Sequence, residues 1–338
     1  MKKLEYHMFI TITKKETRIS YRFIVFYTER VFYTEGVSDE AKITILSTCD
    51  LPKYESLEYP ISHPNHHVEY HLTSGYCNGI HCLDARLLRN SQDYSYFDEI
   101  IFWNPTTREV KLLPPNPRAP TGNVICFGGF GTSDPDTFDQ FKYIQIYMVT
   151  DDNNIAIVDA ELYDLNSDSW FVIHDIHDSY FNVNTIPALN FIAEAYCNGL
   201  YHWLSGDFTF ILCFDFRCNK FRTIKTPSTT KFCRIIVAND CIAYLAYESH
   251  DSSGDLVEIW NLKQDESWVK QCKIGPVETG IYIRALLNDY TEFLAEPVFD
   301  EMPLYNSRGQ LLRKFDIPAQ YYYFCIYHHV ETIAPLSL

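Results

Sequence analysis

The chain has 338 residues, of which 46% are hydrophobic and 16% aromatic, and its formal charge is −16. The apolar content excludes a disordered chain, a collagen and a coiled coil. Because phosphate contacts need Lys and Arg, the negative charge argues against nucleic acid and anionic membranes as partners. An acidic surface favours a basic protein partner, although the same charge also serves solubility.

The sequence gives no sign of export. No apolar run reaches the roughly 18–20 residues that a bilayer span needs. The N-terminus begins with Lys2 and Lys3 but has no small-residue cleavage site, so no secretory signal is expected. The eleven cysteines lie mostly in apolar runs, and no N-glycosylation sequon occurs. We therefore expect reduced thiols and a location in the cytoplasm or the nucleus.

In chain order, the first predicted strands cover residues 18–31 and 41–47. A unit then recurs in which an apolar-aromatic strand, a turn opened by Asn or Asp and a second strand follow one another. Its copies cover residues 100–114, 160–173, 210–224, 257–274 and 303–317. Asn and Asp open turns by accepting hydrogen bonds from nearby backbone amides. The predicted turn-opening residues are Asn104, Asp164, Asp215, Asn261 and Asn306.

A second motif precedes some of these copies. The segments CNGIHCL at 77–83 and CNGLYHWL at 197–204 place Asn-Gly before an apolar strand, and NDCIAYLAY at 239–247 is a weaker relative. Asn-Gly is the strongest short hairpin signal, so the two motifs together predict groups of four antiparallel strands. A spacing of about 45–50 residues is typical of propeller blades. The sequence predicts one all-β domain over 18–338, β-propeller-like, with about six blades.

An ordered set of motifs carries a family resemblance. The set comprises CNGIHCL (77–83), FWNPTTREVKLLPPNP (102–117), ICFGGFGTSDPDTFDQFKYIQI (125–146), ELYDLNSDSW (161–170), GLYHWL (199–204), ILCFDFRCNKFRTIKTP (211–227) and EIWNLKQDESWVKQCKI (258–274). With these residues the chain resembles the F-box-associated domain of plant F-box proteins, most of all the S-locus F-box proteins. The likeness runs from about residue 18 to the C-terminus.

The resemblance implies a kelch-like domain that recognises the substrate of an SCF-type ubiquitin ligase. It implies no covalent chemistry and no cofactor. The partner it implies is a basic protein target, with stylar self-incompatibility ribonucleases as the family's proposed targets.

The N-terminus departs from this family, in which a helical F-box precedes the domain. Only seventeen residues precede the first matching strand. One helix of that length would be about 25 Å long, which is too short for an adaptor-binding helical unit. We therefore expect residues 1–17 to be irregular, without a complete F-box. A Skp-type adaptor and a cullin are partners only if an F-box is present, and the alternative is a tetherless binder or truncated product.

Acidic loops are the candidate contact surface for a basic partner, because surface loops carry specificity without disturbing a core. Four stretches stand out, at 134–139, 151–154, 175–178 and 248–255. Affinity that depends on such charges should fall as salt rises. The candidate partner-binding residues are Asp134, Asp136, Asp139, Asp151, Asp152, Asp175, Asp178, Glu248, Asp251 and Asp255.

Two stretches of the sequence contain residue types that are found in ligand sites. The histidines of 61–71 (His63, His66, His67 and His71), with Cys77, His81 and Cys82 behind them, are zinc-type ligands. Their spacing matches no closed metal motif, which favours an exposed polar loop. The glycines of Gly128–Gly131 could suggest a phosphate loop, but an acidic loop follows them instead of a helix N-terminus. Close packing of a strand is the favoured interpretation.

An enzymatic alternative is a propeller hydrolase with carboxylates at the mouth of the channel. It requires two carboxylates that face each other. The acid pairs in the sequence, such as Asp151-Asp152 and Asp265-Glu266, are adjacent along the chain and fit solvated turns better. The tryptophans recur at repeat positions, which indicates packing between blades; they are Trp103, Trp170, Trp203, Trp260 and Trp268.

Overall fold

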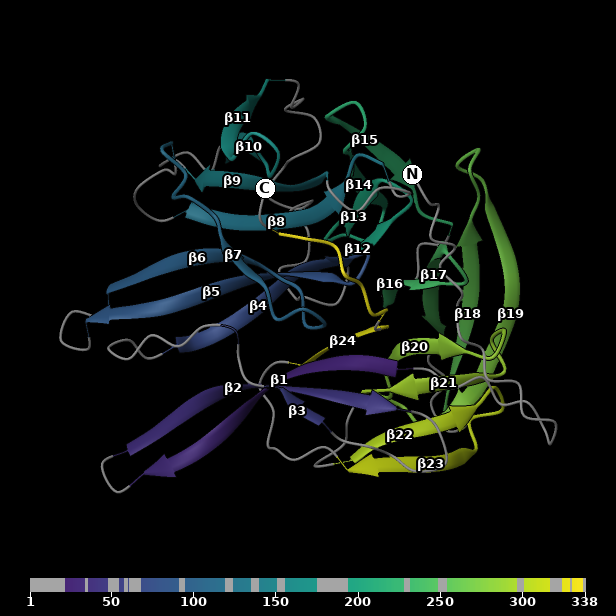
Figure 1. Cartoon of the computed structure of the whole chain (residues 1–338). Coiled ribbons are helices and arrows are strands. Elements are labelled where there is room, and N and C mark those ends of the chain that lie inside the picture. The colour runs from purple at the N-terminus through teal and green to yellow at the C-terminus, as the bar shows by residue number, and fades with distance from the viewer. Residues whose placement is uncertain are drawn as a thin grey trace, which may run out of the picture.

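The structure is a computed structural model that describes residues 22–33, 36–47, 55–57, 60, 68–90, 95–118, 124–134, 140–150, 156–174, 194–227, 232–248, 254–296, 301–316, 324–328 and 330–336. Within these residues there are 24 strands and no helix. The strands form six four-stranded antiparallel sheets, which Figure 1 shows arranged in a ring. The predicted all-β propeller with about six blades is confirmed, while the predicted irregular segment 1–17 lies outside the described residues.

The sheets are numbered here as blades 1 to 6 in chain order. Blade 1 contains β24 (Phe324–His328), β1 (Arg22–Tyr33), β2 (Gly36–Ser47) and β3 (Glu55–Leu57). Blade 2 contains β4 (Val68–Cys77), β5 (Ile80–Asn90), β6 (Ser95–Trp103) and β7 (Val110–Leu112). Blade 3 contains β8 (Val124–Thr132), β9 (Phe141–Thr150), β10 (Ala156–Asp164) and β11 (Ser169–Ile173).

The second half of the ring repeats this order. Blade 4 contains β12 (Glu194–Cys197), β13 (Leu200–Leu204), β14 (Phe210–Asp215) and β15 (Lys220–Lys225). Blade 5 contains β16 (Cys233–Ala238), β17 (Cys241–Glu248), β18 (Asp255–Leu262) and β19 (Trp268–Val277). Blade 6 contains β20 (Ile283–Leu287), β21 (Glu292–Ala295), β22 (Glu301–Asn306) and β23 (Leu311–Asp316).

The two hairpins predicted for a blade are both present. Asn78-Gly79 and Asn198-Gly199 join the first and second strands with positive φ at both residues, as an Asn-Gly hairpin turn requires. Asn104, Asp164, Asp215 and Asn306 open the turn between the third and fourth strands. In each case the side-chain oxygen accepts a hydrogen bond from the amide two residues later, at 2.9–3.0 Å.

The prediction for Asn261 is wrong. This residue lies inside β18, and its amide donates to the hydroxyl of Tyr290. The hairpin of blade 5 is longer than the other four, so Asp265 takes the turn position and accepts from the amide of Ser267 at 3.1 Å. Asn261 and Asp265 both lie in the mostly polar stretch 261–267, and the length of β18 determines which of them opens the turn.

The last described strand closes the ring. β24 pairs antiparallel with β1, with Phe23 opposite His328 and Tyr27 opposite Phe324. Figure 1 shows yellow β24 beside purple β1. Blade 1 therefore takes its first strand from the end of the chain and its other three from the beginning. The sequence motifs do not predict this closure.

The core lies between neighbouring sheets. The first strands of the blades approach one another, since β4 contacts β8, and β16 contacts both β12 and β20. Trp103 and Trp203 are buried, and the other three tryptophans pack half-buried against core clusters, which confirms the predicted packing role. Trp170 and Trp268 hold equivalent places at the start of outer strands. Their indole Nε1 atoms donate to the carbonyls of Pro114 and Lys225 of the preceding blade, at 2.9 and 2.8 Å.

Candidate functional site: the two rims of the propeller

The ring has two rims that differ in their connections. Because strands alternate in direction, the links between first and second strands and between third and fourth strands meet at one end of the blades, here named the turn rim. It contains short turns such as 78–79, 198–199 and 239–240. The other links form the connection rim, with 113–123 and 174–193 as its longest segments. Long surface connections are where binding residues usually lie, so the connection rim is the candidate contact surface.

The predicted acidic stretches do not all belong to one rim. β9, β11 and β17 lead into 151–154, 175–178 and 248–255, and all three strands end at the connection rim. β8 leads into 134–139 and ends at the turn rim. Seven of the candidate residues lie outside the described residues, namely Asp136, Asp139, Asp151, Asp152, Asp175, Asp178 and Asp251.

The three described candidates differ in accessibility. The Glu248 side chain is 38% exposed, and its Oε2 lies 3.1 Å from the Lys273 Nζ. Asp255 is only 7% exposed, and its Oδ1 accepts from the Thr279 hydroxyl at 3.3 Å. The prediction of Asp255 as an exposed contact residue is therefore corrected, because it is the first residue of β18 and not part of the loop. Asp134 is half-buried.

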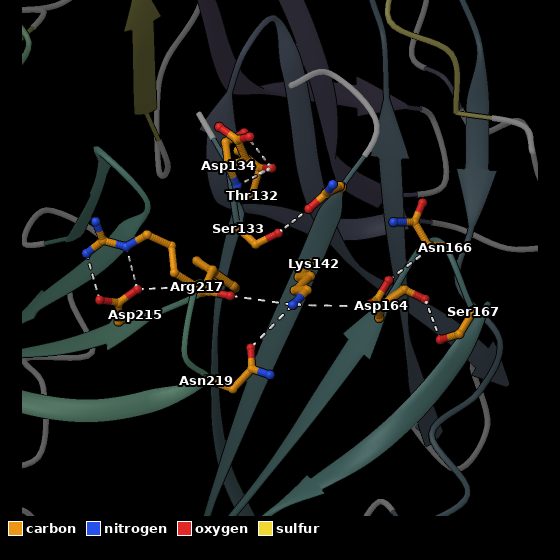
Figure 2. A network of polar contacts seen from close by, with 12 residues as sticks. Thr132, Ser133, Asp134, Lys142, Asp164, Asn166, Ser167, Asp215, Arg217 and Asn219 are labelled. Atoms are coloured by element: carbon orange, nitrogen blue, oxygen red, sulfur yellow. Dashed lines mark hydrogen bonds and ion pairs between the residues drawn. The ribbon is translucent and has the colours of Figure 1, made fainter. Parts of the chain in front are cut away.

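Polar side chains on the turn rim of blades 3 and 4 bind one another, as Figure 2 shows. Lys142, whose side chain is 12% exposed, donates to the Phe216 carbonyl and to Asn219 Oδ1 at 3.4 Å each. Its Nζ also lies 3.9 Å from Asp164 Oδ2, so the lysine joins the two blades. The neighbouring Asp215 holds Arg217 through two hydrogen bonds of 2.9 and 2.7 Å. The charged groups of this network are thus engaged within the chain.

A C-terminal strap, residues 330–336, covers the turn rim of blade 2. Asn104 is fully buried beneath it, and its Nδ2 donates to the carbonyls of Thr332 and Ala334 at 3.1 and 3.0 Å. The Oδ1 of the same side chain accepts from the amides of Thr106 and Thr107. The Asn of the NPTT motif therefore both opens its turn and anchors the strap. Only the first role could be read from the sequence.

The glycine strand β8 provides space at the centre of the ring. A Cβ at Gly129 would lie 2.6 Å from Trp203 and 2.8 Å from Tyr201, both on β13 of the next blade. The Trp203 Nε1 donates to the Gly128 carbonyl at 3.0 Å. These contacts confirm the interpretation of Gly128–Gly131 as close strand packing.

Glu194 lies at the connection-rim end of β12. Burial raises the pKa of its carboxyl to about 8; a hydrogen bond from Tyr201 lowers it and the charge of Asp84 raises it. Glu194 is therefore mostly protonated at neutral pH and acts as a hydrogen-bonding group. The described residues contain no group of three or more side chains suited to a metal ion. His63, His66 and His67 lie outside those residues, and the ring of His81 packs in an aromatic cluster with Tyr76, Trp103 and Tyr327.

The comparison with known families decides the affiliation of this chain. Residues 42–297 match the family described as the F-box associated beta propeller domain. The chain belongs to this family. The family resemblance read from the motifs is thereby confirmed, while the S-locus subtype stays a prediction.

Curated relatives of this F-box-associated chain come from Arabidopsis thaliana. The putative F-box protein At3g21120 is 25% identical over 178 residues, which cover 52% of this chain and 43% of the relative. The F-box protein At1g30790 is 27% identical over 263 residues, which cover 70% of this chain and 59% of the relative. The chain thus spans about half the length of these relatives.

Solved structures are more distantly similar to this F-box-associated domain. The β-propeller domain of Cps50 (Swd1) from Myceliophteria thermophila aligns with a TM-score of 0.45 and 12% identity, over 87% of this chain and 88% of that one. AztD from Citrobacter koseri aligns with a TM-score of 0.39 and 9% identity, over 93% of this chain and 100% of that one. Among the residues that the structure describes, no helix is long and apolar enough to cross a membrane.

Proposed function

We propose that the chain is the substrate-recognition module of an SCF-type ubiquitin ligase, and that it binds a basic protein without catalysing a reaction. The match of residues 42–297 to the F-box-associated propeller family carries this proposal. The formal charge of −16 supports a basic target through electrostatic attraction. A stylar self-incompatibility ribonuclease is the specific target that the S-locus resemblance suggests.

We infer that the target contacts the connection rim. Part of the turn rim is occupied by contacts within the chain, since Lys142 joins two blades and the strap covers Asn104. β9, β11 and β17, which precede three of the four acidic stretches, end at the connection rim. In the cytoplasm or nucleus, a Skp-type adaptor and a cullin would bring the bound target to ubiquitin transfer through an F-box.

The test is binding of a purified basic stylar ribonuclease to the whole chain at low and moderate salt. We expect binding to weaken at least tenfold when connection-rim acids are neutralised in one variant, Asp151→Asn, Asp152→Asn, Asp175→Asn, Asp178→Asn, Glu248→Gln and Asp251→Asn. A control neutralises four turn-rim acids, with Asp134→Asn, Asp136→Asn, Asp139→Asn and Glu266→Gln, and should bind normally. Equal binding by both variants, or no dependence on salt, would contradict the proposed rim.

The ligase role needs a second measurement. Co-precipitation of the chain with a Skp-type adaptor distinguishes a ligase receptor from a tetherless binder. Capture of both adaptor and target supports the receptor, whereas capture of the target alone contradicts ligase coupling and supports the alternative.

A further inference from the structure

Side chains of blade 2 hold the backbone of the C-terminal strap. The strap is not part of any of the six sheets. Three of its amides, those of Val330, Thr332 and Leu336, donate at 3.0–3.3 Å to the side chains of Tyr76, Thr106 and Glu109, respectively. The Asn104 Nδ2 donates to two strap carbonyls at 3.1 and 3.0 Å. Blade 2 thus binds this segment through its main chain, which a segment of another sequence also possesses.

The side chains of the strap alternate between the core and solvent. Ala334 and Leu336 are 4% and 2% exposed and belong to the same core cluster as Ile80 and Phe102. Ile333, by contrast, is 69% exposed. This period of two is that of an extended chain. The site therefore selects a small residue and a leucine that are two positions apart.

Gly79 leaves space for the strap. A Cβ at this position would lie 2.4 Å from Thr332 Cγ2 and 2.6 Å from the Val330 carbonyl oxygen. Gly199 occupies the equivalent turn of blade 4 with nearly the same φ, +81° against +83°, but the nearest atom to its Cβ would be 3.5 Å away. The turn of blade 2 is thus fitted to a segment that lies across it.

The strap can leave without opening the ring. β24 ends at His328 and closes blade 1 by pairing with β1, and the strap begins two residues later. Chain ends that are held by a few hydrogen bonds open at low free-energy cost. Departure of the strap uncovers the apolar places of Ala334 and Leu336, which is unfavourable in water. A second segment that fills these places therefore stabilises the displaced state.

We propose that Tyr76, Gly79, Asn104, Thr106 and Glu109, here named the strap groove, bind an extended segment of a partner polypeptide, and that the strap is the internal ligand which this partner displaces. The partner segment has the pattern of the strap, Thr-x-Ala-x-Leu. Main-chain hydrogen bonds supply affinity and the places for alternate side chains supply specificity. The groove is on the turn rim and is independent of the basic target proposed for the connection rim.

A fluorescent peptide with the sequence of residues 329–338, HVETIAPLSL, tests the groove on the whole chain. Leu336→Asp releases the strap, because a carboxylate is unfavourable in the core. We expect anisotropy to show saturable binding to this variant, at least tenfold tighter than to the unaltered chain. There the tethered strap competes at an effective concentration on the order of millimolar. The peptide HVETIAPDSL should bind at least tenfold more weakly, and moderate salt should change neither result.

Two glycine substitutions separate the groove from other surfaces. Gly79→Ala and Gly199→Ala, each combined with Leu336→Asp, introduce the same strain at positive φ. Only Gly79→Ala places a methyl group where the segment lies, so it should weaken peptide binding at least tenfold, whereas Gly199→Ala should leave it unchanged. Cooperative urea unfolding of each variant shows that it is folded. Ala334→Arg is the second release variant, and it should bind the peptide as Leu336→Asp does.

Displacement is measured on the unaltered chain by amide hydrogen exchange with mass spectrometry. Excess HVETIAPLSL should speed exchange in the strap, and excess HVETIAPDSL should not. The proposal is overturned if neither release variant binds the peptide saturably, or if both glycine variants lose binding equally. It is also overturned if excess peptide leaves strap exchange unchanged, because the strap is then a fixed part of the fold.

Discussion

The two rims of the propeller differ in how regular their sequence is and in how their polar side chains are used. At the turn rim the sequence is regular, with Asn or Asp at repeated positions, and its polar groups are used to hold turns, blades and the strap. The links between strands that end at the connection rim are longer in sequence, and there Arg234 and Arg284 share the carboxylate of Glu296. The comparison indicates that the repeats specify the ring, whereas the connection rim is the surface proposed for recognition.

Asn104→Ala should give the largest loss of stability, because it removes contacts that hold the turn rim of blade 2 together. The change removes two hydrogen bonds to the strap and two within the turn, and it leaves the carbonyl of the buried Ala334 without this donor. We expect a loss of about 3 kcal/mol in the free energy of unfolding, measured with urea. The control is Asn306→Ala in the equivalent turn of blade 6, which is not buried beneath the strap and should lose only about 1 kcal/mol. Equal losses would contradict the anchoring role of Asn104.

The pH dependence of stability tests the connection rim, because Glu194 lies at that end of β12. Its folded pKa of about 8 lies above the ordinary value of 4.5, so the folded state binds more protons than the unfolded state between these values. Stability should therefore fall as pH rises from about 5 to 8, by an amount on the order of 2 kcal/mol. Glu194→Gln should remove this fall.

His202 has the opposite effect on the pH dependence of stability, so its contribution must be separated from that of Glu194. Burial lowers its pKa to about 4, so the unfolded state binds more protons than the folded state between pH 4 and 6.5. That contribution makes stability rise with pH in this range. The His202 contribution cancels when the free energy of unfolding of the Glu194→Gln variant is subtracted from that of the unaltered chain. A difference that does not change with pH would contradict the role given to Glu194.

Tryptophan substitutions test how blades are joined between the rims. Trp268→Phe removes the hydrogen bond from Nε1 to the Lys225 carbonyl, and we expect a loss of about 1–2 kcal/mol in urea unfolding. Trp260→Phe is the matched control, because its buried Nε1 has no hydrogen-bond partner within the described residues. That change should cost less, and the reverse order would show that ring volume outweighs the hydrogen bond.

The smallest stability effect is expected for exposed acids. Glu248→Gln at the connection rim and Glu266→Gln at the turn rim each break one exposed ion pair, with Lys273 and Arg222. Each should change the free energy of unfolding by less than about 0.5 kcal/mol. Only Glu248→Gln should weaken binding of the basic ribonuclease, as measured by titration calorimetry. Equal weakening by both would remove the distinction between the rims.

Local chemistry explains which features the sequence could predict. Asn78-Gly79 and Asp164 form their turns with neighbouring residues, so their roles follow from short segments. The identity of the turn residue in blade 5 depended on where β18 ends, which Asn261 alone does not encode. The strap on Asn104 and the Arg234–Glu296 pair join residues 230 and 62 positions apart. No local pattern fixes such distances, so these contacts required the three-dimensional structure.

Closure by β24 has a consequence for biosynthesis. A ribosome releases the N-terminal strands first, yet β1 must wait for the final segment before it can pair on that side. Blades 2 to 6 each consist of four consecutive strands and can assemble during translation, whereas blade 1 is completed only at the end. A premature stop codon ahead of residue 324 would therefore leave an open ring with an unpaired strand edge, which is a template for aggregation.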